Sequence, residues 1–443
     1  MGLTRTLAGC VRLLCLICLL AGGCAAKAQP PATEADNAAR PATGAQPANG
    51  TQPATGAPGR MIDPVEGALL LPGGAPLDDA AMAALAGNAG YVLIGEGHTS
   101  ACDHMVQTRL IRVLSLANTA AQPPILGMEM VATDAQPVLD RFNAGSLALA
   151  DLRDALDWDT AWRHDWNGYE PIFALSREPG MPPVYALNLP SRVVRDVVRK
   201  GIEGIDLADL RYLPSQVVLP AEEQIASLQT VFGQHMAMRA GHGNATRVHG
   251  NAEAAPATDA PADANGSAPA PDLQRFLEVQ SLWDSAMAEQ AALLRTRFGV
   301  PVIIIAGSGH VEAGWGIAHR LETFDPTGTS FAIMPWRGGK PPEPGMADAF
   351  FYCPEIHTSR LGFTLEFHSD RAVVLDVTPG SKAEAAGLAP GDVLRAAQGM
   401  AVDSLWTLHK AGVAARDAGG TLTLDVERNG APLSLAIVVV DED

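Results

Sequence analysis

Two four-residue segments, Gly95-Glu96-Gly97-His98 and Gly307-Ser308-Gly309-His310, share one pattern although more than two hundred residues separate them. Each follows an apolar run, Tyr91-Val92-Leu93-Ile94 before the first and Val302-Ile303-Ile304-Ile305-Ala306 before the second. Such runs are typical of buried parallel strands. Ligands of an open α/β sheet collect at the carboxyl ends of its strands. The pattern therefore predicts that both histidines face one shared site.

The residues around these segments alternate between apolar runs typical of buried strands and the apolar spacing typical of helices. Further apolar runs predict strands at 125–130 and 184–187, and helical spacing predicts helices at about 103–116 and 273–296. Repeated units of strand and helix indicate a mostly parallel sheet with helices on both faces. We therefore predict an α/β domain over residues 61–340.

Side chains that can chelate metals or transfer protons stand at these strand ends. Glu96, His98, Glu129 and His310 end strands or begin loops, and Asp284 lies inside the long helix. Carboxylates beside imidazoles can hold a divalent metal, orient a water or act as general acid and base. They could instead cap helices and satisfy loop carbonyls. The glycines beside each histidine, which let the backbone approach a ligand closely, favour a functional site.

The amino-terminal segment predicts export and lipid attachment. A basic start precedes an apolar run at 13–20 that is too short to span a membrane. Small residues before Cys24 resemble a bacterial lipobox, so we expect residues 1–23 to be a signal peptide and Cys24 to carry lipid. Cleavage without lipid is the alternative. A lipid-modified terminus would anchor the protein to a membrane of the bacterial cell envelope, facing the periplasm.

Two segments have compositions that predict disorder. Residues 24–60 and about 241–271 are rich in small and polar residues and cannot bury enough surface to order themselves. We expect the first to be a flexible tether and the second a surface insertion. His235, His242 and His249 recur every seven residues into this insertion. They could form an arm that binds metal or haem, but the neighbouring glycines favour a solvated loop.

The net charge limits the classes of partner that we expect, and the cysteine positions bear on whether a disulfide forms. The net charge is −18, from 31 basic and 49 acidic residues, so we expect no nucleic-acid partner, because nothing would neutralise a run of phosphates. Apart from Cys24, the expected mature chain contains Cys102 and Cys353. A disulfide is one interpretation in an oxidising compartment. Their wide separation favours two separate thiols.

An aromatic stripe precedes the third predicted strand. Trp158, Trp162, Trp166 and Tyr169 are spaced by four, four and three residues, which places them on one face of a helix. We expect this stripe to be buried. The alternative is an exposed wall for a porphyrin or a peptide.

Several segments of the first domain together resemble the ChaN-like haem-binding uptake proteins of the Tiki/TraB superfamily. Their order and spacing follow that family over about residues 64–336. The resemblance implies that the domain binds haem or a metal-containing ligand in uptake or trafficking. It also adds His104 and Asn188 as candidate ligand-binding residues and leaves a homodimer open. The matching segments are 94–98 with His104 and Gln107, 126–130, 186–190, 280–288 and 306–311.

The same superfamily implies a rival chemistry, because some members with two Gly-x-x-His motifs and a glutamate are metal-dependent proteases. In a hydrolase of this type, His98 and His310 would be metal ligands together with Glu129 or Asp284. Glu96 would be the general base. No enzymatic activity is assigned on the sequence alone.

The resemblance also implies a tyrosine as the haem ligand, but it does not say which one. We expect Tyr91 and Tyr185, which begin buried strands, to belong to the core. Tyr169 and Tyr212 are expected to be more accessible. All five candidates are Tyr91, Tyr169, Tyr185, Tyr212 and Tyr352.

Past Pro354 the chain changes to short alternating strands, and Asn429-Gly430 between apolar runs predicts a hairpin. Residues 379–394 and the loop Arg360-Leu361-Gly362-Phe363 resemble a bacterial-type PDZ domain, which we place at 357–441. Such domains capture an extended peptide by strand addition, and their loop amides take its terminal carboxylate. The resemblance implies that these four loop residues bind peptide. A groove that only packs against the first domain, or an adaptor with an inactive first domain, is the alternative.

Overall fold

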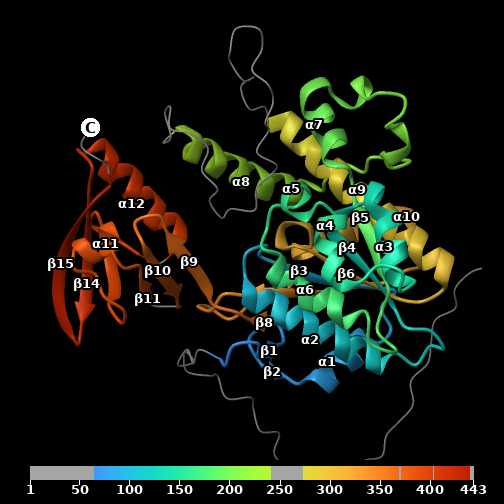
Figure 1. Cartoon of the computed structure of the whole chain (residues 1–443), viewed down its shortest axis with the longest axis horizontal. Helices are drawn as coiled ribbons and strands as arrows, with labels where there is room; N and C mark the ends of the chain where they lie inside the picture. Colours follow the sequence, from blue (N-terminus) through green and yellow to red (C-terminus); the bar gives the residue numbers. More distant parts are fainter. Residues whose placement is uncertain (1–63, 241–272, 369–370, 403, 440–443) are drawn as a thin grey trace, which may run out of the picture. The chain divides into compact units, whose positions relative to one another are not determined.

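The computed structural model of the chain describes two folded parts of the sequence (Figure 1). Several predicted features lie outside the described residues: the signal peptide, the lipidation of Cys24, the tether, and the insertion with His242 and His249. Among the helices that are described, none combines the length and the apolar character needed to cross a bilayer. The described residues are 64–240, 273–368, 371–402 and 404–439.

The first sheet has eight strands in the order β2-β1-β8-β7-β3-β6-β4-β5. The six strands from β8 to β5 run parallel, and the short β1 and β2 pair antiparallel at one edge. The predicted, mostly parallel α/β sheet is therefore confirmed. The strands are β1 (Leu69–Leu70), β2 (Pro76–Leu77), β3 (Tyr91–Glu96), β4 (Ile125–Ala132), β5 (Val184–Asn188), β6 (Val302–Gly307), β7 (Ser330–Trp336) and β8 (Ala349–Tyr352).

Helices cover both faces of this sheet (Figure 1). On β3, Val92 and Ile94 pack with α1 to α6, whereas Tyr91 and Leu93 pack with α9 and α10. This period of two explains why the strand is apolar throughout. The helices are α1 (Asp79–Ala86), α2 (Ala101–Ala117), α3 (Gln136–Asn143), α4 (Leu149–Ala155), α5 (Trp158–Ala161), α6 (Trp166–Leu175), α7 (Ser191–Lys200), α8 (Glu222–Ala240), α9 (Leu273–Phe298) and α10 (Ile317–Phe324).

The first sheet also differs from expectation at its end. We placed the boundary of the first domain at residue 340, but β8 pairs with β7 beyond it.

The aromatic stripe also differs from expectation. It forms two short helices, because Arg163 has a φ of 68° and Asp165 caps a new helix by accepting from the amide of Asn167. Its burial is as expected for all members except Trp162, which is half-buried.

Cys102 and Cys353 form a disulfide, so the expectation of two separate thiols is wrong. The two Cα atoms lie 5.8 Å apart although 251 residues separate them in sequence. Cys102 is in the first turn of α2, and Cys353 directly follows β8. The pairing arises because β8 joins the sheet, a long-range contact that sequence spacing does not reveal.

The second sheet is antiparallel, has seven strands and forms a PDZ domain. Its strand order is β15-β14-β12-β11-β10-β9, with β13 paired to β12. Asn429 and Gly430 have φ values of 52° and 79°, which confirms the predicted tight hairpin. The elements are β9 (Glu355–Ser359), β10 (Phe363–Phe367), β11 (Ala372–Val377), α11 (Lys382–Ala385), β12 (Val393–Ala397), β13 (Met400–Ala401), α12 (Leu405–Asp417), β14 (Thr421–Arg428) and β15 (Ala431–Val438).

Candidate functional site

Glu129 of β4 and the ends of β3 and β6 meet at Gly307, and β4 continues past Glu129 to Ala132, beyond the strand end predicted at residue 130. The register of β3 and β6 pairs Glu96 with Gly307, and the Gly307 amide donates to Glu129 Oε2 at 2.6 Å. A Cβ atom at Gly307 would lie 2.9 Å from His98 Cε1 and 3.6 Å from Glu129 Oε2. The first distance is too short for a real contact, so the His98 ring needs a glycine here. Residues from three strands therefore converge, as the sequence predicts.

His98 is held by the fully buried Glu96. The Nδ1 atom of His98 lies 2.8 Å from Glu96 Oε1, and the hydroxyl of Tyr169 donates to the same oxygen. His104 Nε2 lies 3.6 Å from Glu96 Oε2. Burial alone would raise the pKa of Glu96, but the imidazoles of His104 and His98 outweigh it and lower the pKa below its usual range. Glu96 is therefore an anionic anchor for His98.

His310 has an equivalent anchor in Asp284 of α9. Its Nδ1 atom lies 2.6 Å from Asp284 Oδ1. The other oxygen, Asp284 Oδ2, lies 3.5 Å from Arg320 Nη1 and accepts from Gln224 Nε2 at 3.3 Å. Asp284 and Arg320 are both fully buried. On its far side the His310 ring reaches Glu129, with Nε2 at 3.5 Å from Oε1.

The two imidazoles thus share one arrangement, in which a buried carboxylate holds Nδ1. Such a partner fixes the orientation and the tautomer of the ring. Histidines bound to metals are usually held in this way. The donor set of His98, His310 and Glu129 therefore fits a divalent cation, and it equally fits proton transfer.

A compact metal cluster is not preformed at this site. In the part of the chain that the structure describes, the group whose ligand atoms all lie within 4.8 Å of one another is Cys102, Asp103 and Cys353. Its two cysteines are bonded to each other, so it is not a metal site. His310 Nε2 lies within this limit of Glu129 Oε1, at 3.5 Å, but His98, Glu129 and His310 do not all lie within 4.8 Å of one another.

Several buried polar atoms around His98 have no hydrogen-bond partner among the described residues. They are His104 Nδ1, Trp162 Nε1 and Ser308 Oγ, while Glu96 Oε2 and His104 Nε2 face each other at 3.6 Å, just beyond hydrogen-bond distance. A buried polar atom left without a partner costs about 1–3 kcal/mol. A concentration of such atoms at one place is typical of a site that takes a polar ligand or bound water.

Aromatic rings flank both histidines. The His98 ring centre lies 4.9 Å from that of Trp162 and 5.1 Å from that of His164. Trp283 lies edge-on to His310 at 6.2 Å. Neither His164 nor Trp283 stands at a strand end, so the strand pattern of the sequence does not predict their place beside the histidines.

His104 and Asn188, the two predicted ligand-binding residues, both contact other groups of the chain. His104 is buried against α6, where a Cβ atom at Gly168 would come within 2.3 Å of its Nδ1. It contacts Glu96 and positions that carboxylate. Asn188 is half-buried, and its Oδ1 accepts from the amide of Leu189 at 2.7 Å. Direct ligand binding by either residue stays a prediction.

Tyr169 is fully buried, so the expectation that it is accessible is wrong. Its hydroxyl donates to Glu96, which lies 73 residues away in sequence. Burial and the negative charge of Glu96 raise the pKa of Tyr169 well above its usual value, so it stays a hydrogen-bond donor. The aromatic stripe marks this tyrosine as a core residue, but no local pattern marks its contact with the site.

The predicted peptide-binding loop of the PDZ domain joins β9 to β10. Gly362 has a φ of 86°, and a Cβ atom there would lie 2.2 Å from Ser381 Cβ, so this position requires glycine. Phe363 packs in the core of the domain, whereas Arg360 is exposed and Leu361 is half-buried. The backbone of the loop, rather than the Phe363 ring, is therefore what a peptide could meet.

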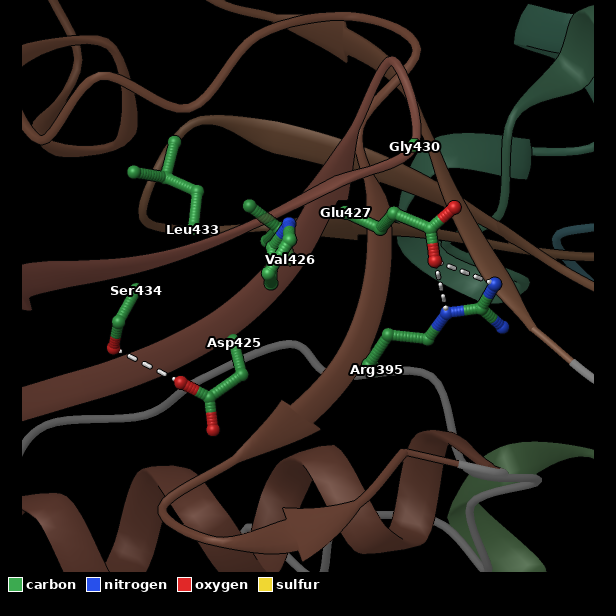
Figure 2. A pocket seen from close by; sticks show the side chains of 8 residues that line it. Arg395, Asp425, Val426, Glu427, Gly430, Leu433 and Ser434 are labelled. Atoms are coloured by element: carbon green, nitrogen blue, oxygen red, sulfur yellow. Dashed lines mark hydrogen bonds and ion pairs between the residues drawn. The ribbon is translucent and has the colours of Figure 1, made fainter.

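A hollow of about 510 Å³ lies on β14 and β15 of the PDZ domain (Figure 2). Its polar side chains pair with one another, Arg395 with Glu427 at 3.1 Å and Ser434 with Asp425 at 2.9 Å. In the strand order, β12 and β11 stand between this hairpin and β10. The hollow is therefore separate from the peptide-binding loop.

Residues 82–321, just over half of the chain, match the protein family described as haem-binding uptake, Tiki superfamily, ChaN. The chain belongs to the ChaN family. Residues 359–439 match the PDZ domain family, in agreement with the second sheet. No curated protein matches the chain.

Solved structures similar to this ChaN-family chain include one described as cofacial haem binding to ChaN of Campylobacter jejuni. That protein is 16% identical, with a TM-score of 0.47 over 66% of this chain and 98% of its own. The PDZ domain of HtrA3, bound to a phage-derived ligand, is 24% identical, with a TM-score of 0.14 over 16% of this chain and 64% of its own.

Proposed function

We propose that this ChaN-family chain is a haem-binding lipoprotein of the bacterial cell envelope that works in haem or iron uptake or trafficking. The family membership of residues 82–321 carries the proposal. Lipid on Cys24 would attach the protein to a membrane. The PDZ domain would bring a peptide or protein partner to the haem-binding domain.

Tyr212 is the tyrosine that fits haem iron best. Tyr91, Tyr169 and Tyr352 are buried, so iron cannot reach their hydroxyls. Tyr185 is half-buried, but it packs on the ring of Phe298 at 5.3 Å. Tyr212 lies in a short turn between α7 and α8 and is partly exposed. Tyrosine is one of the residue types that ligate haem iron in proteins.

The surroundings of Tyr212 also suit haem. Its hydroxyl accepts from Arg211 Nη2 at 2.8 Å, and the guanidinium of Arg192 lies 5.0 Å from its ring centre. The exposed guanidinium of Arg211 could pair with a carboxylate such as a haem propionate, whereas Arg192 is already paired with Asp134 and Asp209. Leu207 and Leu210, which precede Tyr212, are 85% and 44% exposed and offer apolar surface to a porphyrin.

Haem titration tests this assignment. We expect Tyr212→Phe to weaken haem binding at least about tenfold, equivalent to about 1.4 kcal/mol, because it removes the iron ligand and keeps the ring. Tyr185→Phe, which changes the other half-buried tyrosine, should bind haem as the wild type does. The measurement is the Soret band during titration of the chain without residues 1–60. The assignment fails if Tyr212→Phe titrates like the wild type, and haem binding itself fails if the wild type gives no Soret band.

A metal-dependent hydrolase is the second candidate, and the two carboxylate-held imidazoles beside Glu129 favour it. A divalent cation would supply Lewis-acid polarisation of a substrate carbonyl. His98, His310 and Glu129 would hold it, while Glu96 and Asp284 orient the two rings from behind. Glu96 is too deeply buried to serve readily as the general base. Calorimetric titration with Zn²⁺ separates the two functions, because haem binding at Tyr212 needs neither histidine.

The membrane anchor has its own test. Cys24→Ala should move the protein from the membrane fraction to the soluble fraction while the far-UV circular dichroism of the folded domains stays unchanged. The physical reason is that residues 25–60 contain almost no large apolar side chains to bind lipid. A mutant that stays in the membrane fraction would contradict lipid attachment at Cys24. The matched control, Cys18→Ala within the predicted signal peptide, should fractionate like the wild type.

A further inference from the structure

Strand β10 of the PDZ domain is paired along both of its edges. It pairs with β11 on one side and with β9 on the other, both antiparallel. A peptide that binds by strand addition needs an open strand edge beside the carboxylate-binding loop. The edge of β10 that a peptide would use is therefore taken by β9, a segment of the same chain.

The end of β9 also occupies the loop. The Gly362 amide donates to the main-chain oxygen of Ser359 at 3.0 Å, and the Leu361 amide donates to Ser359 Oγ at 3.2 Å. These are the loop amides that would otherwise take the terminal carboxylate of a peptide. Ser359 lies opposite Phe363 in the register, so β9 runs in the direction that a bound peptide would have.

We propose that the segment Glu355–Ser359 is an internal ligand of the PDZ domain, which closes the peptide groove until the segment leaves. In this arrangement a peptide partner does not add to an open edge. It replaces a strand that is already there. Peptide binding then depends on the fraction of molecules in which β9 is released, because the apparent dissociation constant equals the intrinsic one divided by that fraction.

The composition of β9 fits a strand that can be displaced. Its one large apolar side chain, Ile356, is 50% exposed, whereas β10 buries Phe363 and Leu365. Burial raises the pKa of Glu355, and burial together with the charge of His409 on α12 lowers the pKa of His357. Docking therefore disfavours the charged form of both groups. Backbone pairing holds β9 in place with little help from apolar burial.

The first experiment releases the strand in the full chain. The probe is the synthetic peptide Pro-Glu-Ile-His-Thr-Ser, which has the sequence of residues 354–359 and a free carboxyl terminus. His357→Pro should weaken the pairing of β9, because His357 and Ser359 point their main-chain groups toward β10 and proline cannot donate to the ladder. An attached strand competes at an effective concentration of about millimolar. We expect fluorescence anisotropy to give about 10- to 100-fold tighter binding to His357→Pro than to the wild type.

The second experiment locks the strand and does not depend on whether the proline variant folds. Thr358 and Thr364 face each other across β9 and β10 with their hydroxyl oxygens 3.1 Å apart. In Thr358→Cys/Thr364→Cys, oxidation should form a cross-link that abolishes probe binding, and reduction should restore the wild-type level. The wild type under the same oxidant and reductant controls for the native disulfide.

A loop variant serves as the control, and three results would overturn the proposal. Adding Gly362→Val to His357→Pro should remove probe binding, because the new side chain meets Ser381 in the loop. The proposal is overturned if the oxidised, locked chain binds the probe as well as the wild type does. It is also overturned if a folded His357→Pro chain binds no more tightly than the wild type, or if no variant binds the probe at all.

Discussion

Asp284→Ala should lower the free energy of unfolding by about 3–5 kcal/mol, the usual loss when one partner of a buried ion pair is removed. The reason is Arg320, which is 0% exposed and has its Nη1 atom 3.5 Å from Asp284 Oδ2. Without Asp284 this guanidinium is a buried charge without its carboxylate, and His310 loses its Nδ1 partner. Urea denaturation followed by tryptophan fluorescence measures the effect.

The double variant Asp284→Ala/Arg320→Met separates the structural role of Asp284 from its role at the site. Removing both charges should recover part of the lost stability, because an apolar replacement of a whole buried pair is often tolerated. Recovery is incomplete, since Arg320 also donates to Gln224 Oε1 at 2.6 Å. His310 stays without its anchor, so any Zn²⁺ affinity should remain about 10- to 100-fold lower. A single variant as stable as the wild type would contradict this account.

The site was predictable where it depends on strand ends. An apolar run that stops at a glycine predicts the end of a buried strand, and parallel strands bring their carboxyl ends to one edge. This reasoning brought Glu96, His98, Glu129 and His310 together correctly. Periodicity was also sufficient for the α/β class, because β3 and β6 are apolar on both faces.

The supporting contacts were not predictable, because they join side chains that no local pattern relates. Tyr169 lies in a stripe that indicates burial, yet nothing in its spacing shows that its hydroxyl meets Glu96. Arg320 lies on α10 and appears as an ordinary helix residue until α9 places Asp284 beside it. Strand β9 shows no apolar alternation, and it becomes a strand through its pairing with β10. Such elements depend on tertiary contacts more than on propensity.

Removing the disulfide is the second change from which we expect a large loss of stability. Cys102→Ser/Cys353→Ser should lower the free energy of unfolding of the first domain by about 3–5 kcal/mol. The bond closes a loop of 251 residues, and the entropy that a cross-link removes from the unfolded chain grows with the logarithm of loop length. In a domain of this size, such a loss corresponds to a fall in melting temperature of about 10 °C.

Calorimetry with and without reductant checks this prediction and contains its own control. The serine variant should melt at the same temperature in both buffers, and the reduced wild type should match it. The core of the PDZ domain contains neither cysteine, so we expect a transition from that domain to stay in place. If reductant leaves the first-domain transition of the wild type unchanged while both thiols become reactive, the cross-link does not stabilise the fold. The contacts of β8 with β7 and β1 would then be sufficient to keep Cys353 beside α2.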